Sequence, residues 1–192
     1  MSETTIELRD GETALFGYGS LMSVASVERT LGRRYSGPFV MAGVLGWRRG
    51  WDIAMPNQTY SARDGDAAYR PQHILYLNVR PDAGTLLNGV VFVVNKEELS
   101  GFDCREWSYS RHTVNDQLQG VRVVGGRVDM YVAKPEYVLR DVRSPRIAAI
   151  RASYLRILET GLADLGSAHR AGYLASSDPV PEQLVIDDYL DG

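Results

Sequence analysis

The chain has 192 residues, a length that favours one domain with a full hydrophobic core. Its 44% hydrophobic and 23% charged content is ordinary for a globular protein, and a net charge of −3 gives no reason to expect a nucleic acid or an anionic membrane as partner. The single cysteine, Cys104, excludes an internal disulfide. One cysteine fits a reducing compartment, and we find neither a signal peptide nor a membrane-spanning run, so we expect a cytoplasmic protein.

The first elements in the chain are a strand and a short helix. Residues 13–20, TALFGYGS, predict a strand that runs into a glycine-containing loop. Residues 22–33 predict a short helix with Ser23 as its cap and Gly32 as its end.

The next part of the chain is predicted to consist of strands and one long loop. Residues 38–53 alternate in polarity and are rich in aromatic residues, which predicts one or two strands. Residues 55–72 are polar and rich in turn formers, which predicts a loop. Strands are expected again at residues 73–81 and 88–94, the second buried on both faces because it is a continuous apolar run.

The last part of the chain contains the predicted helices. Residues 95–107 predict a short helix capped by Asn95. Residues 121–133 predict a hairpin, because two β-rich runs flank a Gly-Gly pair. Residues 144–166 form the strongest helical pattern, with apolar residues at helical spacing at Ile147, Ile150, Tyr154, Leu155 and Leu158.

Together these elements predict an α+β domain over residues 1–175, built on a curved sheet or small barrel. Residues 176–192 are punctuated by prolines and are expected to form a C-terminal tail.

The stretch LFGYGSLM, residues 15–22, raises a specific question about the two glycines on either side of Tyr18. It lacks the lysine and spacing of a phosphate-binding P-loop, and the third glycine of the dinucleotide motif is replaced by Met22. The glycines allow a tight turn, or they allow the backbone to approach a small ligand closely. The residues alone leave both interpretations open.

Glu106 lies among aromatic residues in the segment FDCREWSYSRHTV. An apolar pocket would raise the pKa of its carboxyl group towards the range useful for proton transfer. The alternative is a surface glutamate paired with Arg105 or Arg111.

Cysteine and histidine chemistry has little support in the sequence. Cys104 and His112 lack a visible orienting partner, so we interpret the cysteine as unreactive rather than as a nucleophile. The three histidines are scattered without metal-ligand spacing. We therefore expect no metal site.

The ordered combination of short motifs resembles the γ-glutamylcyclotransferase-like family. The segments are FGYGSLM at 16–22, GVVFVV at 89–94, FDCREWSYSRHTV at 102–114 and DMYVA at 129–133, followed by a tyrosine-bearing helix. The resemblance covers roughly residues 13–175. FGYGSLM, AGVLGWRR and CREWSY are most similar to the ChaC branch, which cleaves glutathione. The ChaC-type Arg-Gly-Thr-Pro segment is missing, and Trp107 stands where the broader family often has glycine.

The resemblance implies a small mixed β-barrel with flanking helices and a pocket at its mouth. It implies that the backbone of the YGSL loop holds the γ-glutamyl group and that one essential glutamate falls on Glu106. The implied substrate-binding residues are Tyr18, Gly19, Ser20, Leu21, Tyr131 and Tyr154. The oligomeric state is left open.

The implied reaction is cyclisation of a small γ-glutamyl substrate to 5-oxoproline, without a metal or cofactor. Glutathione is one candidate substrate; a γ-glutamyl amine or a specialised metabolite is an alternative. A non-catalytic binding module is a second alternative, although it would not need Glu106. We expect residues 55–72 to line the leaving-group side of the pocket, because long loops in compact domains are often functional.

Overall fold

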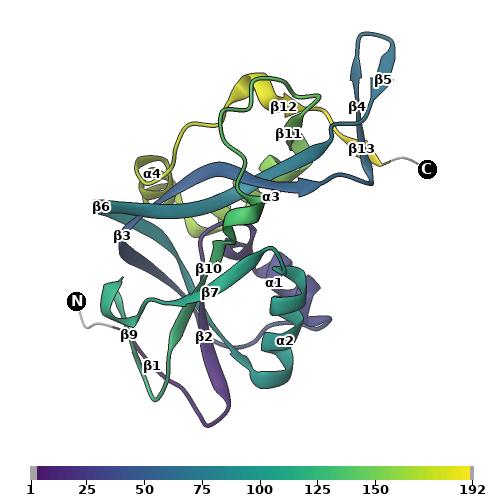
Figure 1. Cartoon of the computed structure of the whole chain (residues 1–192). Helices are drawn as coiled ribbons and strands as arrows, with labels where there is room; N and C mark the ends of the chain where they lie inside the picture. The colour runs from purple at the N-terminus through teal and green to yellow at the C-terminus, as the bar shows by residue number, and fades with distance from the viewer. Residues whose placement is uncertain (1–3, 191–192) are drawn as a thin grey trace.

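The computed structural model describes residues 4–190, so the outermost residues of the expected domain and tail, 1–3 and 191–192, lie outside the described residues. The fold is α+β, and its main sheet curls into half a barrel (Figure 1). The strands of this sheet are β2 (Glu12–Gly17), β3 (Phe39–Pro56), β6 (His73–Asn95), β7 (Tyr109–Thr113), β8 (Leu118–Gln119), β10 (Val128–Ala133), β11 (Ala148–Arg151) and β12 (Val185–Ile186).

The remaining elements lie around this sheet. Two smaller sheets pair β1 (Thr4–Glu7) with β9 (Val121–Val124), and β4 (Tyr60–Asp64) with both β5 (Ala67–Tyr69) and β13 (Tyr189–Leu190). The helices of the described chain are α1 (Val24–Leu31), α2 (Lys96–Arg105), α3 (Ala152–Leu165) and α4 (Ser167–Ala175). Helices α1 and α2 lie together on one side of the sheet (Figure 1).

A long antiparallel ribbon of β3 and β6 crosses the molecule (Figure 1). The two strands predicted at 73–81 and 88–94 are parts of one continuous strand, β6. Of the segment predicted at 38–53, residues 39–53 lie in one strand, β3, which pairs with β6. The pairing runs from Phe39 opposite Phe92 to Pro56 opposite His73. Its register shifts between Leu45 and Trp47 and again between Gly50 and Ile53. This long ribbon joins the half-barrel to the β4–β5 end of the molecule.

Two expected helix ends are confirmed. Asn95 caps α2 through a reciprocal pair of hydrogen bonds with Glu98, which satisfies two backbone donors. Helix α1 ends at Gly32, which has a left-handed φ of 67°. The Ser23 side chain makes no capping hydrogen bond, although it stands at the N-terminal boundary of α1.

Residues 55–72 were expected to form a loop, and most of them form the β4–β5 hairpin. The Asn57 side chain fixes its base by donating to the carbonyl oxygens of Tyr60, at 2.7 Å, and Pro71, at 2.9 Å. Gly65, with a φ of 58°, makes the turn between the strands. The polar composition of residues 55–72 therefore reflects their exposure to solvent rather than a lack of regular secondary structure.

The hairpin expected at residues 121–133 is wrong. β9 pairs in parallel with β1, whereas β10 pairs in parallel with β2 and antiparallel with β7. The chain turns at the Gly-Gly pair, as predicted, but there it passes from one sheet into another. The predicted pairing of β9 with β10 is therefore absent.

The helix expected at residues 144–166 is shorter than predicted. Residues 148–151 form β11, which pairs with β6 and β12, and α3 begins only at Ala152. Ile150 is completely buried between strands, where a β-branched side chain packs well.

The segment expected as a tail packs onto the domain. β12 pairs with β11, β13 pairs with β4, and Leu184 is buried in the core. Between these strands, the Asp188 carboxylate accepts hydrogen bonds from the Ser153 backbone N–H, at 2.9 Å, and from the Ser153 hydroxyl group. Asp188 thereby satisfies a free donor in the first turn of α3.

Gly89→Ala tests the close approach of β6 to β2. An alanine Cβ would collide with the Gly17 carbonyl oxygen and lie 2.6 Å from the Phe16 ring. We expect the free energy of unfolding, measured in urea, to fall by about 2–3 kcal/mol. In the control Gly101→Ala, the Cβ meets only the Thr30 carbonyl oxygen at 3.9 Å, and helix propensity should raise stability slightly. Equal unfolding midpoints for the two variants would contradict this account.

Candidate active site

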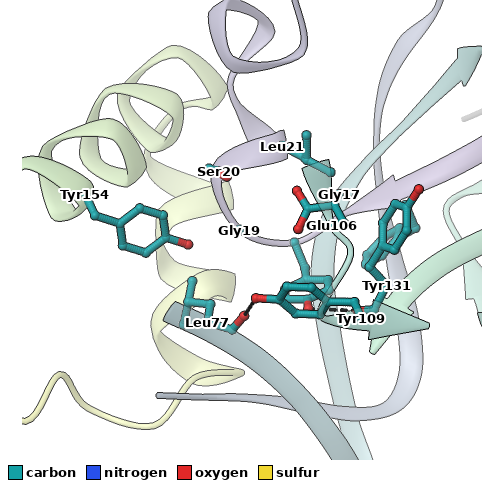
Figure 2. A pocket seen from close by; sticks show the side chains of 11 residues that line it. Gly17, Gly19, Ser20, Leu21, Leu77, Glu106, Tyr109, Tyr131 and Tyr154 are labelled. Carbon is teal, nitrogen blue, oxygen red and sulfur yellow. Dashed lines mark hydrogen bonds between the residues drawn. The ribbon is translucent and has the colours of Figure 1, made fainter. Parts of the chain in front are cut away.

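A narrow slot of about 40 Å³ lies where the loop after β2 meets α2, α3, β6, β7 and β10 (Figure 2). The structure brings all seven residues implied by the family resemblance to this slot. Its lining residues are Phe16, Gly17, Tyr18, Gly19, Ser20, Leu21, Leu77, Glu106, Tyr109, Tyr131 and Tyr154.

The two glycines of the loop have different roles. A Cβ on Gly17 would lie 2.8 Å from the Leu21 Cβ, so Gly17 permits the chain to turn back on itself. A Cβ on Gly19 would lie 3.4 Å from the Tyr154 hydroxyl oxygen. The bare Cα of Gly19 therefore faces across the slot. The tight-turn interpretation applies to Gly17, and a close approach of a ligand to the backbone at Gly19 stays a prediction.

A buried arginine anchors the glycine loop to strand β3. Arg49 of β3 is fully buried, and its Nε donates to the Tyr18 carbonyl oxygen at 2.6 Å. Its other nitrogens donate to the Ser176 hydroxyl at 2.7 Å and to the Asn88 carbonyl oxygen, while its guanidinium carbon lies 4.5 Å from the centre of the Tyr173 ring. Burial lowers the pKa of Arg49 to about 10, so the group stays charged at neutral pH.

Glu106 follows the last residue of α2 and points into the slot (Figure 2). Its side chain is 15% exposed, and Oε1 lies 3.0 Å from the Arg105 Nε. Burial raises the pKa of Glu106 above its ordinary value, and the Arg105 charge opposes that rise. Glu106 is therefore buried, as the pocket interpretation expected, and it also pairs with Arg105, as the alternative expected. Arg111 pairs with Asp103 and Asp129 instead.

Arg105 connects this carboxylate to the glycine loop. Besides contacting Glu106, it donates to the Ser20 hydroxyl at 2.8 Å and to the Thr30 hydroxyl at 2.6 Å. It also donates to the Ser26 carbonyl oxygen at 3.1 Å. The guanidinium therefore fixes Ser20 and Glu106 relative to α1.

Three tyrosine hydroxyls around the slot are already hydrogen-bonded. Tyr18 donates to the Tyr131 carbonyl oxygen at 2.8 Å, and Tyr109 donates to the Leu77 carbonyl oxygen at 2.9 Å. Tyr131 donates to Asp103 at 2.8 Å. Burial raises the pKa of all three tyrosines, so they remain neutral and serve as rigid walls.

Tyr154 differs from the other tyrosines because its hydroxyl has no hydrogen-bond partner among the described residues. The ring is fixed by edge-on contacts with Tyr76, at 5.0 Å between centroids, and Trp51, at 6.3 Å. Its hydroxyl points across the slot towards the glycine loop (Figure 2). Burial raises the pKa of Tyr154, so the group is available as a neutral donor.

The sequence analysis missed three residues that shape the site. Tyr109 carried a signal, because it follows Glu106 by three residues in the same aromatic segment. Arg105 was considered only as a surface partner of Glu106. Arg49 carried no signal, because nothing local distinguishes it from the neighbouring Arg48, which pairs with Asp82 instead.

The structure also bears on the cysteine interpretation. Cys104 is exposed on α2, while the His112 ring packs edge-on against Trp47 at 6.2 Å.

Within residues 4–190, no group of three or more histidine, cysteine or acidic side chains is arranged to hold a metal ion. None of the helices in that range is long and apolar enough to cross a membrane.

Comparison with known proteins supports the fold. No protein-family model and no curated protein matches the sequence. An uncharacterised human protein aligns over 89% of this chain and 92% of its own, with a TM-score of 0.60 and 14% identity. A yeast γ-glutamyl cyclotransferase specific to glutathione aligns over 87% and 96%, with a TM-score of 0.56 and 15% identity. A further γ-glutamyl cyclotransferase aligns over 88% and 91%, with a TM-score of 0.54 and 13% identity. The chain therefore shares the fold of γ-glutamyl cyclotransferases.

Arg49→Lys tests the buried cation beneath the loop. Lysine keeps the charge but lacks the planar fork that reaches Tyr18, Asn88 and Ser176 together. We expect the free energy of unfolding to fall by more than about 2 kcal/mol, because buried acceptors lose their donors. The exposed Arg122→Lys is the matched control and should unfold like the wild type. A wild-type unfolding midpoint for Arg49→Lys would show that the three guanidinium hydrogen bonds do not stabilise the fold.

Proposed function

We propose that the protein is a γ-glutamyl cyclotransferase that converts a small γ-glutamyl substrate into 5-oxoproline and a free amine. The observation that carries this proposal is Glu106, a mostly buried carboxylate with a raised pKa beside a glycine loop. The fold shared with γ-glutamyl cyclotransferases supports the same reaction.

The chemistry requires one acid–base group. The substrate's α-amine attacks its own γ-amide carbon, so a new C–N bond closes a five-membered ring while the original amide C–N bond breaks. A free α-amine has a pKa near about 8, so roughly a tenth of it is neutral at pH 7. Glu106 accepts the proton lost by the attacking amine and passes it to the leaving nitrogen. A positioned group of this kind contributes about 10²–10⁴-fold.

The loop supplies the second requirement, which is to hold the flexible glutamyl chain in a folded conformation. Ser20 and Leu21 open a 3₁₀ helix, so their backbone N–H groups lack partners within that helix. These donors bind the α-carboxylate or the developing oxyanion without a charged side chain. The free hydroxyl of Tyr154 is a further donor on the opposite wall, and Gly19 keeps the space between them open.

Glutathione is the first substrate to test, because the yeast protein of the same fold is specific to it. γ-Glutamyl dipeptides and γ-glutamyl amines are the alternatives, and a cytoplasmic site of action fits all three. Incubation with each compound, followed by quantification of 5-oxoproline, tests the proposal directly. A protein that binds these compounds without releasing 5-oxoproline would be a binding module instead.

Glu106→Gln tests the acid–base role. Glutamine preserves the shape of the side chain but cannot accept the proton, so we expect kcat to fall at least about 100-fold with little change in substrate binding. The control is Glu97→Gln, on the exposed side of the same helix, which should retain wild-type kinetics. A folded Glu106→Gln protein with near-normal kcat would exclude this mechanism.

The pH dependence of kcat/KM tests how burial and the Arg105 charge together set the pKa of Glu106. Because Glu106 must be ionised to act as a base and burial raises its pKa, kcat/KM should fall as the pH drops through a value above the ordinary carboxyl range. Arg105→Met removes the charge that lowers this pKa, so the acidic limb should move to higher pH. Titration of the substrate amine contributes equally to the wild-type and Arg105→Met profiles, so it does not affect the difference between them. An unchanged acidic limb would show that Arg105 does not tune Glu106.

A further inference from the structure

Glu106 also lines a second, wider cavity of about 400 Å³, here called the basin. The slot and the basin share Ser20, Glu106, Tyr109 and Tyr154. A group that leaves the reacting carbon must lie within reach of Glu106, which protonates it. With the glutamyl chain in the slot, the leaving group therefore extends into the basin.

The walls of the basin are strongly basic. Arg29 of α1, Arg105 of α2 and Arg151 of β11 line it, and Glu106 is the acidic residue among its lining side chains. Arg105 is committed to Glu106 and the glycine loop. Arg29 is exposed and makes neither a hydrogen bond nor an ion pair with any described residue. Arg29 therefore supplies a cation that is free for a ligand.

Arg151 adds a rigid second cation. Its side chain is only 11% exposed, and its guanidinium carbon lies 3.8 Å from the centre of the Tyr60 ring. Asp188 lies 3.5 Å from one of its nitrogens, but that carboxylate also accepts two hydrogen bonds from Ser153. The Arg151 Nε is buried without a hydrogen-bond partner. Its two terminal nitrogens donate to the Ser153 hydroxyl, at 3.0 Å, and to the Tyr76 hydroxyl, at 3.3 Å. Arg151 therefore contributes a fixed positive charge to the basin wall, whereas Arg29 supplies the free donors.

We propose that the basin binds a carboxylate on the leaving group, with Arg29 as the direct contact and Arg151 as a supporting cation. This inference rests on the proposed cyclotransferase reaction and specifies its substrate class. The enzyme then acts on γ-glutamyl amino acids or peptides with a free carboxylate in preference to γ-glutamyl amines. A guanidinium binds a carboxylate through paired, charge-assisted hydrogen bonds, which a neutral or cationic amine cannot accept.

The remaining walls fit an amino-acid side chain. Met55, Pro56 and Ile157 give the basin an apolar side. Residues 55–72, expected to contact the leaving group, contribute Met55 and Pro56 directly, and Tyr60 stacks on Arg151. The basin therefore combines an apolar surface with a carboxylate site, as an amino acid or short peptide requires.

A matched pair of substrates tests the inference. γ-Glutamyl-alanine and γ-glutamyl-alaninamide differ only in the terminal carboxylate, and both release 5-oxoproline. We expect kcat/KM of the wild type to favour the acid by about tenfold or more, because a charge-assisted contact contributes about 1.5–3 kcal/mol. Arg29→Met should raise KM for the acid and bring the ratio close to one. The control Arg122→Met removes an equal charge from β9, away from the basin, and should keep the wild-type ratio.

The outcomes separate this inference from the reaction itself. Equal 5-oxoproline formation from the acid and the amide, or a preference for the amide, would overturn the carboxylate site and leave the cyclotransferase reaction standing. An acid preference that survives Arg29→Met would overturn the assignment to Arg29. Absence of 5-oxoproline from both substrates, and from glutathione, would remove the proposed reaction and this inference with it.

Discussion

The buried positive charge of Arg49 is the constraint on which the geometry of the site depends. A guanidinium away from water is stable only when its donors are matched, and Arg49 finds acceptors in the Tyr18 carbonyl, the Asn88 carbonyl and the Ser176 hydroxyl. The Tyr173 ring covers one face of the cation. Because these partners come from the glycine loop, β6 and the end of α4, satisfying one charge fixes three segments against β3.

A second arginine holds the same loop from the opposite end. Arg49 binds the carbonyl oxygen of Tyr18, while Arg105 binds the hydroxyl of Ser20 and the carboxylate of Glu106. The loop backbone and the carboxylate are therefore held in place by the protein's own contacts, which is the preorganisation that the proposed ring closure would need. The same contact sets the basicity of Glu106, because the Arg105 charge opposes the rise in pKa caused by burial.

Features encoded in a few neighbouring residues could be predicted from the sequence, and features that depend on distant partners could not. The Asn95 cap and the glycine-containing turn follow from local chemistry, and the ordered motifs singled out Glu106, which lines the slot together with the glycine loop. The Gly-Gly hairpin failed because β9 finds β1 as its partner, far away in the chain. Arg49 could not be recognised because strand alternation turns one of two adjacent arginines inwards, and only the folded sheet decides which.

The slot and the basin differ in how they are built, and this difference has consequences for variation. The slot is formed by backbone donors, glycines and buried arginine contacts, so changes there disturb the packing of several elements together. The basin presents Arg29, an exposed side chain with no partner among the described residues, next to Met55 and Pro56 at the end of β3. Substitutions at such positions alter which leaving group is bound with little loss of core contacts. In the proposed reaction, the fold would therefore separate the part of the site that closes the ring from the part that selects the leaving group.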